Sequence, residues 1–306
     1  MTLAVLCPGQ GAQHPALFDQ VGAHAESARV IDDAAQSLGE DPREWLRQGD
    51  AIFRNAIAQP LICISQLAQW TLLRSHLPEP AALAGYSVGE LACYGVSGAL
   101  GTAEVVRLAR ARATAMDAAA AANPGRLIGI RGLSRTALRA LCEATHAFIA
   151  IVTADDAFVV GGSDTALDRI WERCERVGAK LTDLRVGIAS HTPLLAAATG
   201  QFQIALDGST LKATPVPVIA GVDAGLVTTR DRAIGTLSAQ ISQTVEWVQC
   251  LDTLHERGCR VFVELGPGRA LSRMLRERFD DVEARSVDEF RDLAGVARWA
   301  QRKVSE

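Results

Sequence analysis

Short runs of consecutive apolar residues alternate along the chain with longer segments in which apolar residues recur every three or four positions. The runs at 3–7 and 261–265 have the pattern of strands buried on both faces of a parallel sheet. The spacing at 15–37, 59–77 and 102–122 predicts amphipathic helices that cover such a sheet. The pattern therefore predicts an α/β protein with a parallel sheet.

The same two patterns continue toward the C-terminus. We expect strands at 216–220 and 282–287, and helices at 230–242, at 245–257, at 269–278 and from residue 288 onward.

A different arrangement begins after Asn123-Pro124-Gly125. Six short elements are predicted there: strand 126–131, helix 134–144, strand 147–153, strand 157–161, helix 164–177 and strand 180–186. The order βαββαβ is that of a ferredoxin-like domain. We therefore expect a small inserted domain at residues 125–187 and a large domain formed by residues 1–124 and 188–306.

Composition and charge narrow the class of protein. The chain has 306 residues, of which 48% are hydrophobic, so it can bury one large core, or one core with a smaller satellite domain. The formal net charge is −4 and the chain has no run of basic residues, which argues against a nucleic-acid partner.

The cysteines and the longest apolar runs bear on metals, redox compartment and membranes. Seven cysteines are scattered singly, with no C-x-x-C pair and no Cys/His spacing suited to zinc, so we expect reduced thiols and no metal. The run at 3–7 is too short for a signal peptide, and no 18-residue apolar span is present. We expect a soluble, cytoplasmic protein with no membrane partner.

The stretch Gly85-Tyr86-Ser87-Val88-Gly89 carries the strongest chemical signal in the chain. It reads Gly-x-Ser-x-Gly between an apolar strand-like run and a helix-like run, which is the sequence context of a nucleophile elbow. The strained turn lifts the serine hydroxyl clear of the backbone at a helix N-terminus, where the Val88 N–H can face a developing oxyanion. A tight turn between strand and helix without catalytic function is the alternative.

The loop Gly9-Gln10-Gly11 follows the first strand. A phosphate-binding loop is one interpretation, but the third glycine, the Lys-Ser/Thr pair of a P-loop and a suitably spaced acidic residue are missing. Because α/β proteins place their sites at the carboxyl ends of parallel strands, this loop and Ser87 can face one cleft. The Gln10 N–H would then be a second oxyanion donor.

Arg112 lies on the apolar stripe of the helix at 102–122. A buried charge without a partner is costly, so this arginine needs an anion. Its side chain can reach outward to solvent or pair with a structural carboxylate, and helical spacing alone favours these interpretations. The alternative is that it binds a substrate carboxylate.

His191 is the candidate general base among six histidines. It directly precedes a helix predicted to start at Thr192, and a helix N-terminus lowers the pKa of a neighbouring histidine and so favours the neutral form. The other five lie in loops or on helix faces that look exposed. A capping or surface histidine is the usual alternative.

Taken together, these motifs resemble those of the malonyl-CoA:acyl-carrier-protein transacylases. The resemblance rests on Gly9 to Gln13, Gly85 to Glu90, the Arg112 helix, Ala189-Ser190-His191, Gln240 to Trp247 and Glu264 to Gly268, in that order. It implies an α/β-hydrolase-like large domain with a ferredoxin-like insert. It also implies a Ser87–His191 dyad, Arg112 holding the malonyl carboxylate, Gln240 near the histidine, and oxyanion donors at Gln10 and Val88.

Departures from the family pattern indicate a branch. Tyr86 stands where histidine is common and Cys7 where an aromatic residue is common. With the run at 91–96, these residues look most like the epsilon (transacylase) subunit of malonate decarboxylase, which loads malonyl onto a carrier subunit with a CoA-like prosthetic group.

The resemblance implies transfer from malonyl-CoA to a carrier-borne phosphopantetheine-type thiol, through a malonyl-serine and without a bound cofactor. The Gln240 side chain or a backbone carbonyl would orient His191, and the sequence leaves both open. Three alternatives remain: a loading transacylase of fatty-acid or polyketide synthesis, a serine hydrolase, and a carrier-binding module without catalysis.

Overall fold

The computed structural model describes residues 1–184 and 186–306. The larger of its two sheets has six strands in the order β10-β9-β1-β2-β7-β8, and only the β7–β8 pair is antiparallel. These strands are β1 (Thr2–Cys7), β2 (Ala82–Gly85), β7 (Val218–Ile219), β8 (Leu226–Val227), β9 (Cys259–Glu264) and β10 (Glu283–Ser286). The predicted parallel sheet is confirmed.

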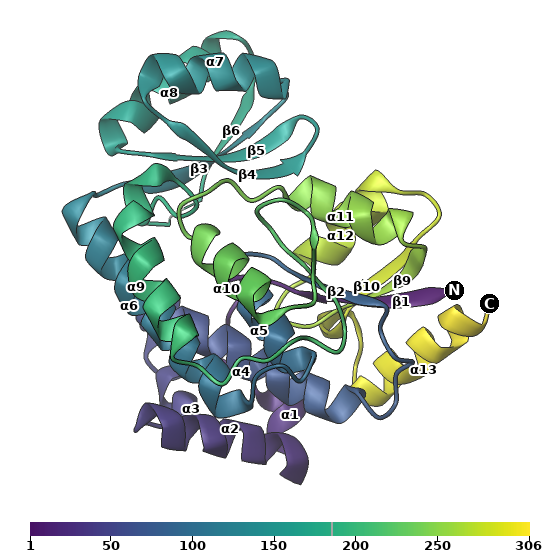
Figure 1. The fold of residues 1–306 in the computed structure, drawn as a ribbon. Helices are drawn as coiled ribbons and strands as arrows, with labels where there is room; N and C mark the ends of the chain where they lie inside the picture. The colour runs from purple at the N-terminus through teal and green to yellow at the C-terminus, as the bar shows by residue number, and fades with distance from the viewer. Residues whose placement is uncertain (185) are drawn as a thin grey trace.

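Helices cover both faces of this sheet, which explains why its central strand is apolar throughout. In β1, Leu3 and Val5 pack into the core shared with one set of helices, whereas Ala4 and Leu6 pack into the core on the other face. The first set includes α2 (Ala25–Leu38), α4 (Asn55–Leu73), α5 (Val88–Val96), α6 (Thr102–Ala122) and α13 (Leu293–Ser305), and the second is α11 (Trp247–Glu256) and α12 (Ala270–Arg278) (Figure 1).

The smaller sheet is antiparallel and has the strand order β4-β5-β3-β6. Its elements follow in the predicted order: β3 (Arg126–Arg131), α7 (Arg135–Thr145), β4 (Phe148–Ala154), β5 (Ala157–Gly162), α8 (Asp164–Arg176) and β6 (Lys180–Asp183). Figure 1 shows α7 and α8 on the outer face of this sheet, away from the larger one. The predicted strand at 180–186 ends early in the structure, and Arg185 lies outside the described residues.

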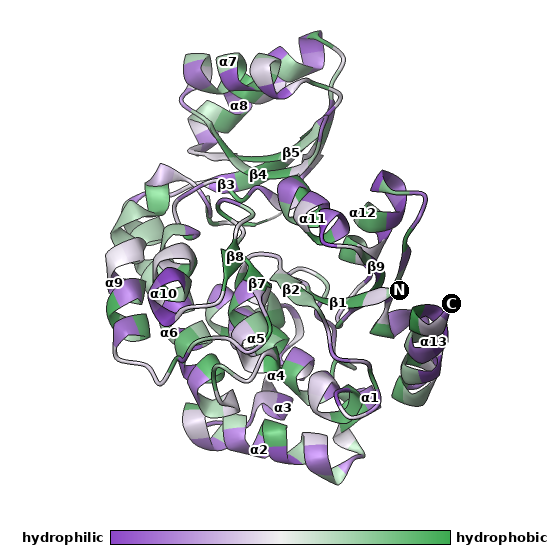
Figure 2. Ribbon diagram, turned by 45° about the vertical axis from the view of Figure 1, so that its right-hand side comes forward, coloured by the Kyte–Doolittle hydropathy of each residue, from purple (hydrophilic) through white to green (hydrophobic). Residues whose placement is uncertain are grey.

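A separate core holds this smaller sheet to its two helices. Ile128, Phe158 and Ile170 are among its buried members. Figure 2 shows hydrophobic strands beneath α7 and α8, which carry both hydrophobic and hydrophilic residues. Serines begin both helices: the hydroxyl oxygens of Ser134 and Ser163 accept hydrogen bonds from backbone N–H groups three residues ahead.

Several boundaries differ from the prediction. α4 begins at Asn55 because buried residues such as Ile57 extend its apolar face, and it ends at Leu73, before an exposed turn. The last helix begins at Leu293 because a 3-10 turn, η3 (Val287–Glu289), comes first. The remaining elements are α1 (Asp19–Gly22), α3 (Pro42–Trp45), η1 (Gly49–Phe53), η2 (Pro193–Leu195), α9 (Ala196–Asp207) and α10 (Arg230–Ala239).

α4 is the one helix of the described residues that is long and apolar enough to cross a membrane by length and composition alone. However, 78% of its most apolar window is buried inside the molecule, between α2, α5 and α6. Its apolar character is that of a core helix.

The register of β1 and β2 brings two loops together. Cys7 pairs with Gly85 at the carboxyl ends of these parallel strands. The glycine loop that follows β1 therefore lies beside the turn that follows β2, at the edge where α/β sheets place their sites.

Candidate active site

The turn between β2 and α5 has the strained geometry of a nucleophile elbow. Ser87 has φ 55° and ψ −119°, a conformation that costs a residue with a side chain about 1–3 kcal/mol. A Cβ on Gly85 would lie 2.1 Å from the Glu90 nitrogen, and a Cβ on Gly89 would lie 2.0 Å from the Cys7 carbonyl oxygen. Both glycines are required by close backbone approach, as the motif predicts.

His191 meets this serine although 104 positions separate them in sequence. Its Nε2 lies 2.9 Å from Ser87 Oγ, and its Nδ1 lies 2.5 Å from the backbone carbonyl oxygen of Gln240. Because a carbonyl only accepts hydrogen bonds, Nδ1 carries the proton and Nε2 is free to accept the serine proton. The alternative left open by the sequence is thereby decided: the backbone of Gln240, not its side chain, orients the ring.

The environment of His191 favours its neutral form. Burial, and secondly the positive charge of Arg112, lower the pKa of His191 to about 3, against a partial opposing effect of the Gln240 carbonyl. The direction agrees with the prediction, but the cause is burial of a side chain that is 1% exposed. The expected helix does not start at Thr192, because the 3-10 turn η2 precedes α9.

Arg112 points from α6 into the same site and is 1% exposed. Its Nη1 donates to Gln59 Oε1 at 2.9 Å and its Nη2 to Gln240 Oε1 at 2.9 Å, with Ser87 Oγ 3.4 Å from Nη2. Among the described residues no carboxylate lies within 4.0 Å of the guanidinium. The side chain neither reaches solvent nor pairs with a structural carboxylate, contrary to the interpretation that helical spacing favours.

Desolvation lowers the pKa of Arg112 to about 10, which still leaves the group protonated at neutral pH. The site therefore contains a buried cation whose direct hydrogen-bond partners are neutral. Such an arrangement favours an added anion, since a carboxylate would supply the missing opposite charge.

The two residues proposed as oxyanion donors lie next to this site. Val88 is the first residue of α5, and Gln10 lines the same cavity as Ser87. In the described part of the chain neither backbone N–H donates a hydrogen bond to the protein. The loop that carries Gln10 is fixed by Gln66 of α4, whose Nε2 donates to the Pro8 carbonyl oxygen at 2.7 Å.

A cavity of about 620 Å³ connects these groups with the smaller sheet. Gln10, Ser87 and Arg112 line it from the larger sheet and its helices, whereas Leu127 and Val159 line it from the smaller sheet. Ser87 thus lies between the two sheets, in a partly apolar space that could shield an ester from water.

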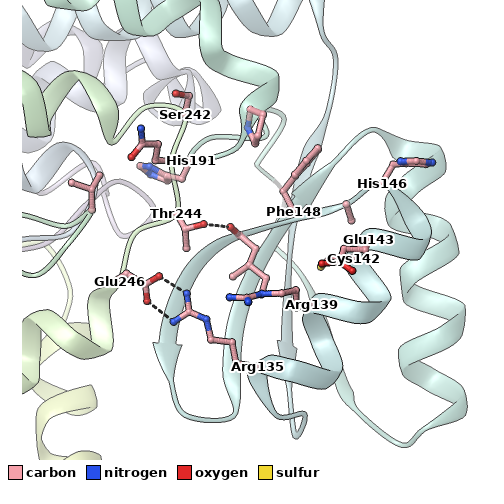
Figure 3. Close-up of a pocket in the computed structure, with 15 residues that line it drawn as sticks. Arg135, Arg139, Cys142, Glu143, His146, Phe148, His191, Ser242, Thr244 and Glu246 are labelled. Carbon is pink, nitrogen blue, oxygen red and sulfur yellow. Dashed lines mark hydrogen bonds and ion pairs between the residues drawn. The ribbon is translucent and has the colours of Figure 1, made fainter.

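The segment that follows Gln240 is braced by the smaller sheet (Figure 3). Val245 accepts a 2.9 Å hydrogen bond from the Val152 N–H and donates one of 2.9 Å to the Ala150 carbonyl. Figure 3 shows Arg135 of α7 bound to the Glu246 carboxylate by two hydrogen bonds, of 2.9 and 2.5 Å, in a cavity with His191 at its other side. The smaller sheet therefore helps to hold the residue that orients His191.

Two residues of the site were missed at the sequence level. Gln59 accepts from Arg112, and Glu90 accepts from the Gln240 side chain. Both are buried in the structure. The sequence feature that could have indicated them is a polar residue within an otherwise apolar helix.

The other expectations concern histidines, cysteines and metals. His14, His24, His76 and His146 are exposed and His255 is partly exposed. The seven cysteines are free and buried. No group of three His, Cys, Asp or Glu side chains among residues 1–184 and 186–306 is placed to hold a metal ion.

Comparisons with known proteins place the chain in a family. Residues 5–301 match the acyl transferase domain family. The chain is 30% identical to the malonyl CoA-acyl carrier protein transacylase of Mycobacterium bovis over 96% of this chain and 99% of that protein. It is 29% identical to polyketide synthase GfsA of Streptomyces halstedii over 92% of this chain, which corresponds to 4% of that much longer protein.

A solved structure shows the same fold. The malonyl-CoA:acyl carrier protein transacylase (FabD) of Xanthomonas oryzae pv. oryzae superimposes with a TM-score of 0.92 and 28% identity, over 98% of this chain and 99% of that one. Because the family match spans nearly the whole chain and the elbow serine meets a buried histidine, the chain belongs to the acyl transferase domain family and is an acyltransferase.

Proposed function

We propose that this protein transfers a malonyl group from malonyl-CoA to the thiol of an acyl carrier protein, through a malonyl ester on Ser87. The observation that carries this proposal is the buried Arg112 guanidinium, which has no carboxylate partner within 4.0 Å in the described chain and whose Nη2 lies 3.4 Å from the nucleophile oxygen. A malonyl group has a free carboxylate that can pair with this cation while its thioester carbonyl meets Ser87.

In the first half-reaction, His191 Nε2 takes the Ser87 proton as Oγ attacks the thioester carbonyl. The N–H groups of Gln10 and Val88 would hold the oxyanion, since neither donates a backbone hydrogen bond in the described chain, Gln10 lines the cavity and Val88 directly follows Ser87. Collapse of the tetrahedral intermediate breaks the C–S bond, and the departing CoA sulfur receives the proton from His191. The Gln240 carbonyl stabilises the imidazolium that exists between these steps.

In the second half-reaction, His191 takes the proton of the carrier thiol, whose sulfur attacks the ester. The Ser87 oxygen leaves and recovers its proton from His191. No further cofactor enters this sequence of steps, because both substrates supply their own thioester or thiol.

The identity of the carrier is the finer part of the proposal. Tyr86, Cys7 and the run at 91–96 favour the carrier subunit of malonate decarboxylase, with its CoA-like prosthetic group. A carrier of fatty-acid or polyketide synthesis has equal support, since one relative is a polyketide synthase and another a malonyl CoA-acyl carrier protein transacylase. We propose a cytoplasmic location for this protein.

The domain division is likewise a proposal. Residues 125–187 would form the ferredoxin-like insert, and residues 1–124 and 188–306 the α/β-hydrolase-like catalytic domain. The strand order β4-β5-β3-β6 and the separate core of that part support this division.

Intact-protein mass spectrometry after incubation with malonyl-CoA tests the function. One malonyl adduct is expected on the wild-type chain and none on Ser87→Ala. Adding each purified carrier in its thiol form to the loaded enzyme then identifies the acceptor, because only the proper carrier removes the adduct faster than water. An adduct that persists on Ser87→Ala would place the nucleophile elsewhere.

A further inference from the structure

Glu90 is a buried carboxylate beside the active site that has no part in the reaction steps above. It lies in the first turn of α5, three residues after Ser87, and is 0% exposed. Its Oε2 accepts hydrogen bonds from the Gly221 N–H at 2.9 Å and from Gln240 Nε2 at 2.5 Å. Its Oε1 is buried and has no hydrogen-bond partner in the described chain.

Gln240 connects this carboxylate to Arg112. Its Nε2 donates to Glu90, and its Oε1 accepts from Arg112 Nη2 at 2.9 Å. A carboxylate on one side can accept and a guanidinium on the other can only donate, so the orientation of the amide between them is chemically fixed. If the amide turned over, its NH₂ group would face the guanidinium and Arg112 would lose one of its two amide acceptors.

The same residue also orients the general base, because the Gln240 carbonyl accepts from His191 Nδ1. Gln240 therefore contacts both His191 and Arg112, and Glu90 accepts a hydrogen bond from the side-chain amide nitrogen of Gln240. Gly221 allows this packing, since a Cβ there would lie 3.0 Å from Glu90 Oε2 and 3.5 Å from Gln240 Nε2.

We propose that Glu90 is a positioning residue for substrate selection: its Oε2 fixes the Gln240 amide so that the amide oxygen holds Arg112 ready for the substrate carboxylate. The inference rests on the proposed malonyl transfer. Oε2 is the atom that matters, because it accepts both hydrogen bonds and Oε1 accepts none.

The protonation state of Glu90 does not alter this role. Burial raises the pKa of Glu90 to about 7, against partial opposition from Gly221, Gln240 and Arg112. A proton bound at Oε1, the oxygen without a partner, leaves Oε2 able to accept from Gln240.

Two conservative variants separate the acceptor from the charge. Glu90→Gln removes the charge but can keep an oxygen at the position of Oε2, whereas Glu90→Asp keeps the charge but withdraws the acceptor by one methylene. We expect Glu90→Gln to keep the ratio of malonyl-CoA to acetyl-CoA kcat/KM within about threefold of wild type. We expect Glu90→Asp to lower this ratio about tenfold, the effect of one weakened hydrogen bond to a charged group.

A double-mutant comparison tests the route through Gln240. In a Gln240→Leu background the amide is absent, so Glu90→Asp should leave the substrate ratio unchanged. Glu264→Asp is the matched control, because Glu264 is also a 0% exposed carboxylate, but it binds the Leu271 and Ser272 N–H groups at the start of α12. That control should not alter the ratio, even where it lowers the melting temperature.

Three outcomes would overturn the inference. One is an unchanged ratio in Glu90→Asp, including the case in which malonyl and acetyl transfer fall by the same factor. Glu90 would then have a structural role only. Another is a larger loss in Glu90→Gln than in Glu90→Asp, which would make its charge the important property. The third is that Glu90→Asp lowers the ratio in the Gln240→Leu background as much as it does in the wild-type background.

The experiment stays decisive if Glu90→Asp fails to fold. Gly221→Ala leaves Glu90 in place and presses a methyl group against Oε2, so it should lower the ratio in the same direction, and an unchanged ratio there counts against the inference. Wild-type loading in the same assay separates this inference from the proposed function. Failure of wild type to prefer malonyl-CoA refutes the function itself. A wild-type preference that stays unchanged in Glu90→Asp and Gly221→Ala refutes the role of Glu90.

Discussion

Replacing Arg112 by alanine is the most direct test of substrate class. The side chain extends from α6 to within 3.4 Å of Ser87 Oγ and is held by the amide oxygens of Gln59 and Gln240. These neutral partners orient the guanidinium without neutralising it. A malonyl carboxylate would complete the charge pair, whereas an acetyl group offers nothing to it.

The size of the effect follows from the burial of this pair. Truncating one partner of a buried, hydrogen-bonded charge pair costs about 2–5 kcal/mol, and about 1.4 kcal/mol corresponds to tenfold. We therefore expect kcat/KM for malonyl-CoA to fall between about 30-fold and about 4000-fold in Arg112→Ala. Arg112→Lys should also lose much of the preference, because an ammonium cannot make the two parallel hydrogen bonds of a guanidinium.

Acetyl transfer should respond in a different way. In wild type an acetyl group leaves the buried Arg112 cation unpaired, so its removal takes away an unfavourable feature of that complex. The positive charge of Arg112 is also the second cause of the low pKa of His191, so the variant has a more basic general base. Acetyl-CoA kcat/KM should therefore stay within about threefold of wild type or rise.

The assay measures release of CoA thiol with malonyl-CoA and acetyl-CoA under the same conditions, with a saturating thiol acceptor. Arg107→Ala is the control on the same helix, because Arg107 is partly exposed and pairs with Glu104 through hydrogen bonds of 2.9 and 3.0 Å. It should leave both values unchanged. If Arg112→Ala reduces malonyl and acetyl transfer by the same factor, Arg112 serves the fold and the malonyl assignment loses its physical basis.

Three further predictions address the general base, the pH dependence that it sets, and the elbow. His191→Ala should slow both half-reactions by about 10²-fold or more in stopped-flow loading, and a loss below about tenfold would identify another base. Because the pKa of His191 is lowered to about 3, its neutral form persists as the pH falls. Wild-type kcat/KM should therefore stay level from pH 7 to pH 5. A base with the ordinary pKa of an exposed histidine would instead give half of the maximal kcat/KM near pH 6.5. Gly89→Ala should lower the melting temperature strongly or prevent folding, because its Cβ would lie 2.0 Å from the Cys7 carbonyl oxygen. Gly235 lies in open space on α10, so Gly235→Ala should raise the free energy of unfolding by about 0.5–1 kcal/mol. Equal melting temperatures for the two variants would contradict this reasoning.

Much of the fold could be predicted from local sequence. The run at 3–7 is apolar at every position because each face of β1 meets a different layer of helices. The sequence alone therefore predicts a buried parallel strand there. The four strands of the smaller sheet and its two helices were predicted because a serine or glycine lies at a boundary of every one except β4. The two-residue strand β8 was missed, since Leu226 and Val227 carry too short a pattern.

The position of Ser87 was likewise readable from sequence, because an elbow is a local structure made by adjacent residues. The Gly85 and Gly89 pattern reflects contacts with the following helix turn and with the neighbouring strand. Without these two glycines, the chain would have neither the sequence motif nor the tight turn that the motif predicts.

Sequence alone determined the strand pattern, the elbow and the residue types available for chemistry, because these depend on neighbours along the chain. Only the tertiary structure decided which groups Arg112, His191 and Gln240 contact, because their partners lie up to 150 positions away. Helical spacing favoured a structural Arg112, but packing of α4, α6 and α10 leaves that cation with neutral partners beside Ser87. Charge compensation and hydrogen bonding depend on distance in space, which periodicity along a chain does not encode.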